Sequence, residues 1–276
     1  MPETVSRGSS TGTFATAARK AVTDAPSCGT PSCGAVTPSA TARPHRFRSR
    51  IGVGLAGGFY PAPHRYQLYL SAGCQRSQRV SITLALLGLE NSTTITVLTG
   101  PAETPDAFAA LRRAYEATWH HYDGPLTAPA LCDRWSGRVV SNHTPDILRD
   151  LADLADLADR TELTELGDGE DLGMPALRPP ALAAEIDALR ELLARDVTPA
   201  SPSPARTATL TLLDHQLAAG PYALGETITA ADVDLWVALT HLDTADDTLS
   251  AHLHLDAYVQ RLGQHPAFLG SGRSVR

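Results

Sequence analysis

Cys74 stands where an alternating segment meets the start of a segment with helical spacing, in the stretch RYQLYLSAGCQRSQRV. A thiol at the first turn of a helix faces unpaired backbone N–H groups and the positive end of the helix dipole, and both favour the thiolate over the thiol. Arg76 and Arg79 add positive charge close by. The pattern therefore predicts a nucleophilic cysteine. The alternative is that Cys74 is a small, buried apolar residue.

The other three cysteines carry weaker signals. Cys28 and Cys33 lie in APSCGTPSCG, but no second Cys or His pair follows at zinc-finger spacing, so we expect no metal site. Cys132 lies in a strand-like segment and is expected to be an unreactive core residue. Because the chain has 276 residues and no apolar stretch of signal-peptide length, we expect all four cysteines to be reduced and the protein to be cytoplasmic.

Charge is distributed unevenly along the chain. Residues 1–50 hold seven Lys or Arg and two Asp or Glu (net +5), which leaves 16 basic and 28 acidic residues (net −12) for the remainder. The later part is therefore acidic, which argues against nucleic acid as a partner. No run approaches 18 consecutive apolar residues, so we expect no membrane partner either.

The first 64 residues do not have the pattern of a folded domain. Residues 1–43 are mostly Ser, Thr, Ala, Gly and Pro with few large apolar side chains, which predicts a disordered tail. Residues 44–64 add basic residues, glycines and a few aromatics, and predict an irregular arm. The sequence GVGLAGG in this arm superficially matches a dinucleotide-binding loop. However, no strand precedes it and no helix begins at it, so we predict no nucleotide site.

Residues 65–158 carry the elements of a thioredoxin-like domain. Alternation of side-chain character predicts the strands, and apolar residues at helical spacing predict the helices. The expected order is strand 66–71, helix 75–87, strand 93–98, helix 105–119, a hairpin of strands 129–133 and 138–140, and a helix with Thr144 as N-cap and Pro145 at its first position. This βαβαββα order predicts that the first two strands pair in parallel.

The second half of the chain is predicted to be helical. Residues 159–180 are rich in Pro, Gly and Asp and predict a linker, residues 181–270 predict an all-helical domain, and residues 271–276 form a short tail. Thr229 and Asp232, flanked by Ile228 and Val233, have the spacing of a capping box with a hydrophobic staple. We therefore expect an α+β protein with a thioredoxin-like domain followed by an all-α bundle.

Together these segments resemble the glutathione S-transferase superfamily, and within it the Xi-class glutathionyl-hydroquinone reductases. The resemblance rests on RYQLYLSAGC, LRRAYEATWHHYDGPLTAPALCDRWSGRVVSN, AAEIDAL and GETITAADVDLW, and covers roughly residues 65–270. It implies the fold of that superfamily, a homodimer, glutathione or another low-molecular-weight thiol as cofactor, and a small-molecule electrophile as substrate.

The resemblance also implies roles for individual residues. Cys74 stands at the position of the catalytic cysteine, which attacks the sulfur of a glutathionyl adduct and forms a mixed disulfide that a second thiol resolves. Pro129 stands at the family's cis-proline, where the backbone of Ala128 pairs with the cysteinyl part of a bound thiol. Thr144 stands where a Ser or Thr at a helix N-terminus holds the γ-glutamyl carboxylate.

Two family motifs are altered in this chain. Where the family has Cys-Pro-Trp, the chain has Cys74 followed by Gln75 and Arg76, which we take as candidate thiol-binding residues. Where the family has Asn-Glu-Ser, the chain has Asn-His-Thr, so His143 replaces the acidic residue that would meet the γ-glutamyl amine. A thiol other than glutathione would account for the loss of that contact.

Three functions remain open from the sequence. The first is a thiol-dependent transferase or reductase of this superfamily that uses Cys74 on a small electrophile such as a quinone conjugate. The second treats Cys74 to Ser77 as the CxxS motif of monothiol glutaredoxins, which would make the protein a deglutathionylating oxidoreductase. The third is a non-catalytic binding protein with the same fold, a reading that the altered thiol-binding motifs favour.

Overall fold

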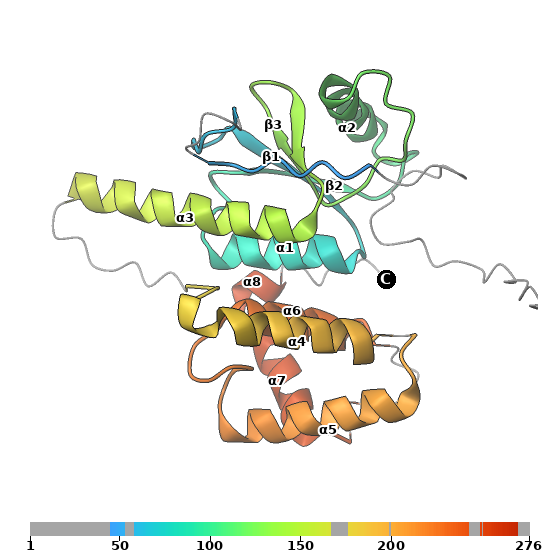
Figure 1. Cartoon of the computed structure of the whole chain (residues 1–276), viewed down its shortest axis with the longest axis vertical. Coiled ribbons are helices and arrows are strands. Elements are labelled where there is room, and N and C mark those ends of the chain that lie inside the picture. Colours follow the sequence, from blue (N-terminus) through green and yellow to red (C-terminus); the bar gives the residue numbers. More distant parts are fainter. Residues whose placement is uncertain are drawn as a thin grey trace, which may run out of the picture. The chain divides into compact units, whose positions relative to one another are not determined.

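The computed structural model describes residues 45–52, 58–166, 176–198, 200–242, 249 and 251–269 (Figure 1). The predicted tails at residues 1–43 and 271–276 and the centre of the GVGLAGG sequence lie outside the described residues. Among the helices that are described, none is both long enough and apolar enough to cross a membrane.

Four short strands form one sheet in the order β2–β1–β3–β4. β1 (Tyr66–Ser71) pairs in parallel with β2 (Thr94–Leu98), as the βαβ pattern predicts, and antiparallel with β3 (Ala130–Asp133). β3 pairs antiparallel with β4 (Arg138–Ser141). The hairpin between them turns at Gly137, whose φ of 68° lies in the left-handed region that glycine adopts readily.

Helices cover both faces of this sheet. α2 (Pro105–Thr118) lies on one face, and α1 (Gln75–Leu86) and α3 (Thr144–Leu166) lie on the other (Figure 1). Because side chains alternate along β1, Tyr69 joins the apolar cluster beneath α2, while Leu68 and Leu70 join the larger cluster on the opposite face. That larger cluster continues into the helical half of the chain, so one core joins α1 to the helices that follow.

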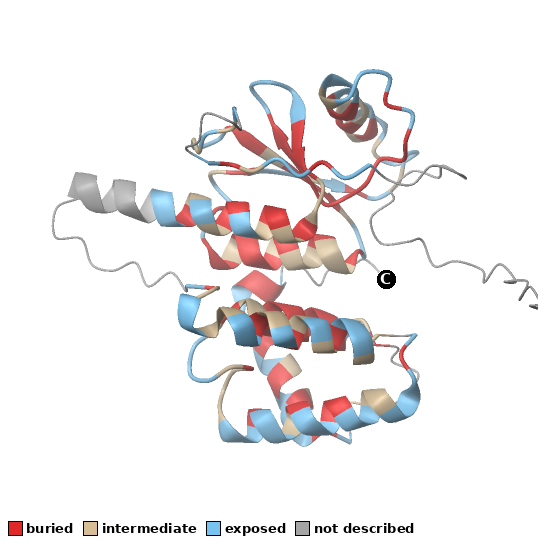
Figure 2. Ribbon diagram, in the orientation of Figure 1, coloured by how far each residue is buried: buried red, intermediate tan, exposed pale blue. Residues whose placement is uncertain are grey.

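Helices are the regular elements of the second half within the residues that the structure describes. They are the 3₁₀ helix η1 (Pro180–Leu182), α4 (Ala183–Asp196), α5 (Ser203–Ala219), α6 (Ala230–Thr240), α7 (Leu253–Gly263) and α8 (Pro266–Leu269). Residues 231–239 of α6 are all buried (Figure 2). A helix that is buried on every side must be enclosed by others. α4, α7 and α1 pack against it, and the α+β fold expected from the sequence is confirmed.

α6 begins with the predicted capping box. The Asp232 carboxylate accepts hydrogen bonds from the Thr229 N–H at 2.8 Å and the Thr229 hydroxyl at 3.2 Å. Its other oxygen accepts hydrogen bonds from the Ala223 N–H at 2.8 Å and the Tyr258 hydroxyl at 2.9 Å. Burial raises the pKa of Asp232 despite these donors. This single side chain therefore fixes the start of the central helix to two other parts of the helical half.

The arm at residues 45–52 is fastened to the first domain. It runs antiparallel beside the outer edge of β4, where the Ser49 N–H donates to the Val140 carbonyl at 3.1 Å. Two of its arginines also reach carboxylates on α3. The ion pairs are Arg48–Asp146, Arg50–Asp150 and Arg50–Asp153. The arm has no helix or multi-residue strand among its described residues, as expected, but its place is fixed by these contacts.

Both ends of α3 differ from the prediction. The helix begins at Thr144 itself, and the His143 carbonyl accepts the Asp146 and Ile147 N–H groups at 2.9 and 3.1 Å. His143 therefore occupies the cap position that we predicted for Thr144. At the other end α3 continues to Leu166, so the first residues of the predicted 159–180 linker are helical. The Arg, Glu and Leu residues of the following RTELTEL sequence (residues 160–166) have high helix propensity and favour this continuation.

Candidate functional site

Three segments of the first domain meet at one edge of the sheet. Tyr69 pairs with Ala130, and Leu131 pairs with Ser141, so β1 ends, β3 begins and β4 ends at the same edge. The segments that follow β1, precede β3 and follow β4 carry the residues predicted to bind the thiol. They are Cys74, Gln75 and Arg76 after β1, Ala128 and Pro129 before β3, and His143 and Thr144 after β4. The topology therefore brings all seven predicted site residues to one place.

Cys74 lies at the N-cap of α1 and is 6% exposed. The turn before it uses Gly73 at a φ of 70°, which is the left-handed conformation suited to glycine. The Cys74 carbonyl accepts the Gln78 N–H at 2.9 Å, and the Ser77 hydroxyl accepts the Ser71 N–H at 2.9 Å. Ser77 of the CxxS motif therefore ties the end of β1 to the first turn of α1.

The cysteines differ in oxidation state. Cys74 is disulfide-bonded, whereas Cys132 is a free, buried thiol. The expectation that all four cysteines are reduced is therefore wrong for Cys74. Burial raises the pKa of Cys132 well above that of an ordinary thiol, which suits an unreactive core residue. Cys28 and Cys33 lie outside the described residues.

The loop before β3 is held by a buried polar network. The Ala128–Pro129 peptide bond is cis, as expected, and both residues are buried. The Tyr115 hydroxyl lies 2.7 Å from the Thr127 hydroxyl, and the Asn142 amide donates to both, at 3.1 and 3.0 Å. Burial raises the pKa of Tyr115 to about 12, so its hydroxyl stays protonated at neutral pH. The sequence predicted the helix at residues 105–119 that carries Tyr115, but not this network.

The start of α3 holds two buried polar atoms, the His143 Nδ1 and the Thr144 hydroxyl, that make no hydrogen bond of good geometry within the described residues. The His143 Nδ1 lies 3.1 Å from an Asp146 oxygen that also accepts from the Arg48 Nε at 2.8 Å. The hydrogen bond from Arg48 lowers the pKa of Asp146. Thr144 is 7% exposed, and its hydroxyl has no hydrogen-bond partner among the residues that the structure describes. Since an unsatisfied buried polar group costs about 1–3 kcal/mol, this hydroxyl indicates a place for a ligand.

The two arginines of α1 have different surroundings. The Arg79 Nε lies 3.2 Å from one oxygen of Asp234, whose other oxygen accepts from Arg190 of α4 at 2.8 Å. The positive charge of Arg79 is therefore compensated by the Asp234 carboxylate of α6. Arg76, half-buried beside Gln75, has no ion pair within the described part of the chain. Burial lowers the pKa of Arg76, and the positive charges of Arg46 and Arg79 lower it further.

His241 joins the end of α6 to α1. Its Nε2 lies 2.6 Å from the side-chain oxygen of Gln78, which is four residues after Cys74 and therefore on the same side of α1. Burial, together with the positive charge of Arg79, lowers the pKa of His241. The ring is therefore neutral at pH 7 and can donate a hydrogen bond that fixes the Gln78 side chain.

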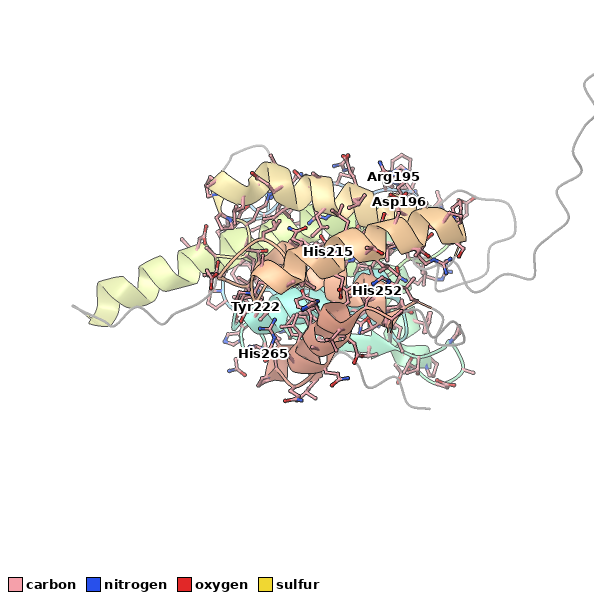
Figure 3. The ribbon with its side chains drawn as sticks, turned by 90° about the horizontal axis from the view of Figure 1, so that it is seen from below. Arg195, Asp196, His215, Tyr222, His252 and His265 are labelled. Carbon is pink, nitrogen blue, oxygen red and sulfur yellow. The ribbon has the colours of Figure 1, made fainter. Side chains whose placement is uncertain are left out.

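Several other titratable groups of the helical half lie at its surface. Figure 3 shows Arg195 and Asp196 together at the end of α4, where they pair at 3.0 Å. Because Arg195 is 70% exposed, this pair contributes little to stability. His215 and His265 are exposed, and His252 is buried just before α7. Among the described residues, no three His, Cys, Asp or Glu side chains are grouped to hold a metal.

Two curated relatives match most of the chain. It is 26% identical over 250 residues to the glutathionyl-hydroquinone reductase YqjG of Escherichia coli (strain K12), covering 76% of this chain and 72% of the relative. It is 27% identical over 261 residues to the glutathionyl-hydroquinone reductase PcpF of Sphingobium chlorophenolicum, covering 83% and 77%.

Solved structures show the same likeness. The glutathione-bound structure of YqjG matches with a TM-score of 0.62 at 25% identity, covering 82% of this chain and 84% of the other. The glutathione S-transferase Xi of Phanerochaete chrysosporium matches with a TM-score of 0.62 at 26% identity, covering 84% and 88%. The family described as "Glutathione S-transferase, C-terminal domain" matches residues 207–261, which run from α5 into α7. With its thioredoxin-like half and its helical half, the chain resembles the glutathione S-transferase superfamily and, within it, the Xi-class glutathionyl-hydroquinone reductases.

Proposed function

We propose that this protein is a thiol-dependent reductase or transferase in which Cys74 reacts with a small electrophile, such as a quinone conjugate, and glutathione is the thiol. The observation that carries the proposal is the place of Cys74 at the N-cap of α1, on the sheet edge shared with the Ala128–Pro129 backbone and the start of α3. A reduced thiol there faces unpaired N–H groups, which favour the thiolate. The names of the curated relatives support the substrate class.

The reaction proceeds by exchange at sulfur. The Cys74 thiolate attacks the sulfur of a glutathionyl-hydroquinone, so that a sulfur–sulfur bond forms and the carbon–sulfur bond breaks. The ring carbon keeps the bonding electron pair and takes a proton, which gives the free hydroquinone. A glutathione thiolate then attacks the mixed disulfide, releases glutathione disulfide and restores the Cys74 thiolate. The conjugate is reduced by two electrons, and the two glutathione sulfurs are oxidised to the disulfide.

The disulfide at Cys74 determines how the cycle begins. Because a sulfur in a disulfide is not a nucleophile, a thiol must first reduce it, and excess glutathione can do so by exchange. A cytoplasmic location would supply that reducing environment. The cytoplasmic location and the homodimer both remain predictions.

The test compares two cysteine variants after reduction and removal of the reductant. Conversion of a glutathionyl-hydroquinone to hydroquinone is followed by chromatography with glutathione as co-substrate. Cys74→Ser is expected to lower kcat/KM by at least about a thousandfold, since an alkoxide is not available at neutral pH. Cys132→Ser, which changes a cysteine on the face beneath α2, should keep activity within about threefold if it folds, and circular dichroism checks that it does.

Other outcomes would redirect the assignment. Turnover that survives in Cys74→Ser would contradict the proposed nucleophile. A wild-type protein that leaves the conjugate intact but removes glutathione from a mixed disulfide would favour the glutaredoxin-like function. Absence of both activities in the reduced protein would favour a non-catalytic binding protein.

A further inference from the structure

The arm carries Arg46 to the edge of the sheet where Cys74 lies. The Asn142 amide donates to the His45 carbonyl at 2.8 Å, and the Phe47 N–H donates to the Asn142 side-chain oxygen at 2.9 Å. The residues on both sides of Arg46 are therefore fastened to the segment between β4 and α3. Arg48, two residues further on, stands opposite Ser141 at the end of β4. The antiparallel direction then places Arg46 beyond the end of β4, beside the start of α3.

The direction of the Arg46 side chain follows from the alternation of side chains along the arm. Phe47 is buried in the cluster beneath α2, with its ring edge-on to that of Tyr115. Arg48 is on the other side of the arm and binds Asp146 of α3. Because successive side chains of an extended chain point to opposite sides, Arg46 points as Arg48 does, toward the face of α1 and α3.

Arg76 approaches the same place from the first turn of α1. Arg76 is two residues after Cys74, which is the N-cap of α1, so it starts from the sheet edge where the segment after β4 also lies, and the positive charge of Arg46 contributes to the lowering of its pKa. Neither arginine makes an ion pair with a carboxylate of the described residues, although the chain as a whole carries a net charge of −7. Two close arginines without a counter-ion in an acidic protein indicate a place for an anion.

The start of α3 supplies further donors. Backbone N–H groups at a helix N-terminus bind carboxylates, and α3 is long enough to have a substantial dipole. The buried Thr144 hydroxyl, which has no partner among the described residues, can donate one hydrogen bond more. Arginine is the side chain best suited to a carboxylate because its planar fork can donate two parallel hydrogen bonds.

We propose that Arg46 of the arm and Arg76 of α1 bind a carboxylate of glutathione at the start of α3, an inference that rests on the proposed use of that thiol at Cys74. In this arrangement the arm is part of the thiol site. The specificity of the site comes from two cations that bind an acid group, and the thiol that it selects must carry a carboxylate near its sulfur.

The test measures binding apart from chemistry. S-methylglutathione keeps both carboxylates but has no free thiol, and its dimethyl ester lacks both negative charges. Calorimetry gives the dissociation constants of each for the reduced wild type, Arg46→Gln, Arg76→Gln, the double variant, and Arg138→Gln as a control. Arg138 is also an exposed arginine but lies at the start of β4, at the opposite end of the strand from the site.

The expected effects follow the burial of the two arginines. Arg76→Gln should weaken S-methylglutathione binding about tenfold, because a half-buried charged hydrogen bond is lost, and Arg46→Gln about threefold, because that side chain is exposed. The double variant should bind S-methylglutathione about thirtyfold more weakly than the wild type and keep its affinity for the ester, and Arg138→Gln should match the wild type. Thermal melts confirm that each variant is folded.

Three results would overturn the inference. They are equal binding of S-methylglutathione by all five proteins, binding of the ester by the wild type as tight as that of the acid, and no binding of S-methylglutathione by the wild type. Turnover of a glutathionyl-hydroquinone by the wild type is measured on the same preparations. Arginine-dependent binding without turnover would leave the carboxylate site standing and remove the proposed reductase function, so the two failures are distinguishable.

Discussion

The starts of α6 and α3 use a similar pair of positions in different ways. In α6 the cap residue Thr229 is followed three residues later by Asp232, which accepts hydrogen bonds from three residues of the helical half. In α3 the cap residue His143 is likewise followed three residues later by Asp146. That carboxylate, however, is bound by an arginine of the arm, and the neighbouring Thr144 hydroxyl has no partner within the described residues.

The difference separates a structural helix start from one that suits a ligand. A buried polar network that is fully satisfied stabilises the fold, whereas one that is missing a partner costs free energy in the empty protein. Departures from complete satisfaction are expected at functional sites, because the ligand supplies the missing group. The comparison therefore assigns the start of α6 to folding and the start of α3 to binding, and each assignment can be tested.

The largest expected effect is that of removing Asp232. Asp232→Ala leaves the N–H groups of Thr229 and Ala223 and the hydroxyl of Tyr258 buried without this acceptor, so we expect the free energy of unfolding to fall by about 4 kcal/mol. Asp146→Ala is the matched change in α3 and should cost only about 1 kcal/mol, because its partner Arg48 is exposed to water. Urea denaturation measures both. Equal losses would contradict the contrast between the two helix starts.

A second prediction concerns the buried carboxylate that holds the arm to α3. Asp150 accepts from Arg50 and from the Ile51 N–H, but its other oxygen is buried without a hydrogen-bond partner in the described part of the chain. Burial therefore raises the pKa of Asp150 to about 6. In the unfolded chain the same group loses its proton near pH 4. The unfolded state thus binds fewer protons between these values, and the contribution of Asp150 to stability falls as the pH rises from about 4 to 6.

Asp150→Asn removes this titration. The free energy of unfolding of the wild type minus that of the variant is expected to fall by about 2 kcal/mol between pH 4 and pH 7. Asp153→Asn is the control, since Asp153 also pairs with Arg50 but is 60% exposed, and its difference from the wild type should change little with pH. Urea titrations at several pH values measure both differences. A difference for Asp150→Asn that stays constant over this range would show that the group remains ionised in the folded state.

The sequence predicted local features better than contacts between distant segments. The turn at Cys74 and the capping box of Thr229 and Asp232 depend on neighbouring residues, so their spacing in the sequence was sufficient to find them. The cap of α3 was placed one residue too late, because Thr is a favourable cap by itself and the use of His143 became visible only in the hydrogen bonds.

Contacts between distant segments could not be read in this way. Arg46 belongs to a stretch without periodicity, and its nearness to Arg76 depends on the arm passing beside β4. The network of Tyr115, Thr127 and Asn142 likewise joins three separate segments. The pairing of Arg79 with Asp234 of α6 changed the expected charge around Cys74 for the same reason, since α1 and α6 are far apart in the sequence.

The smallest expected effect on stability gives the sharpest test of the comparison. Thr144→Val and Thr229→Val make the same substitution at the two helix starts. In α6 the change removes the hydroxyl that donates to Asp232 and should lower the free energy of unfolding by about 1 kcal/mol without altering the affinity for S-methylglutathione. In α3 the hydroxyl has no partner within the described residues, so its loss should leave stability unchanged or slightly higher. The dissociation constant for S-methylglutathione should instead rise about five- to tenfold, because the bound carboxylate loses a charged hydrogen bond.

If Thr144→Val destabilised the protein as much as Thr229→Val and left binding unchanged, the hydroxyl at the start of α3 would be part of the fold rather than of the site.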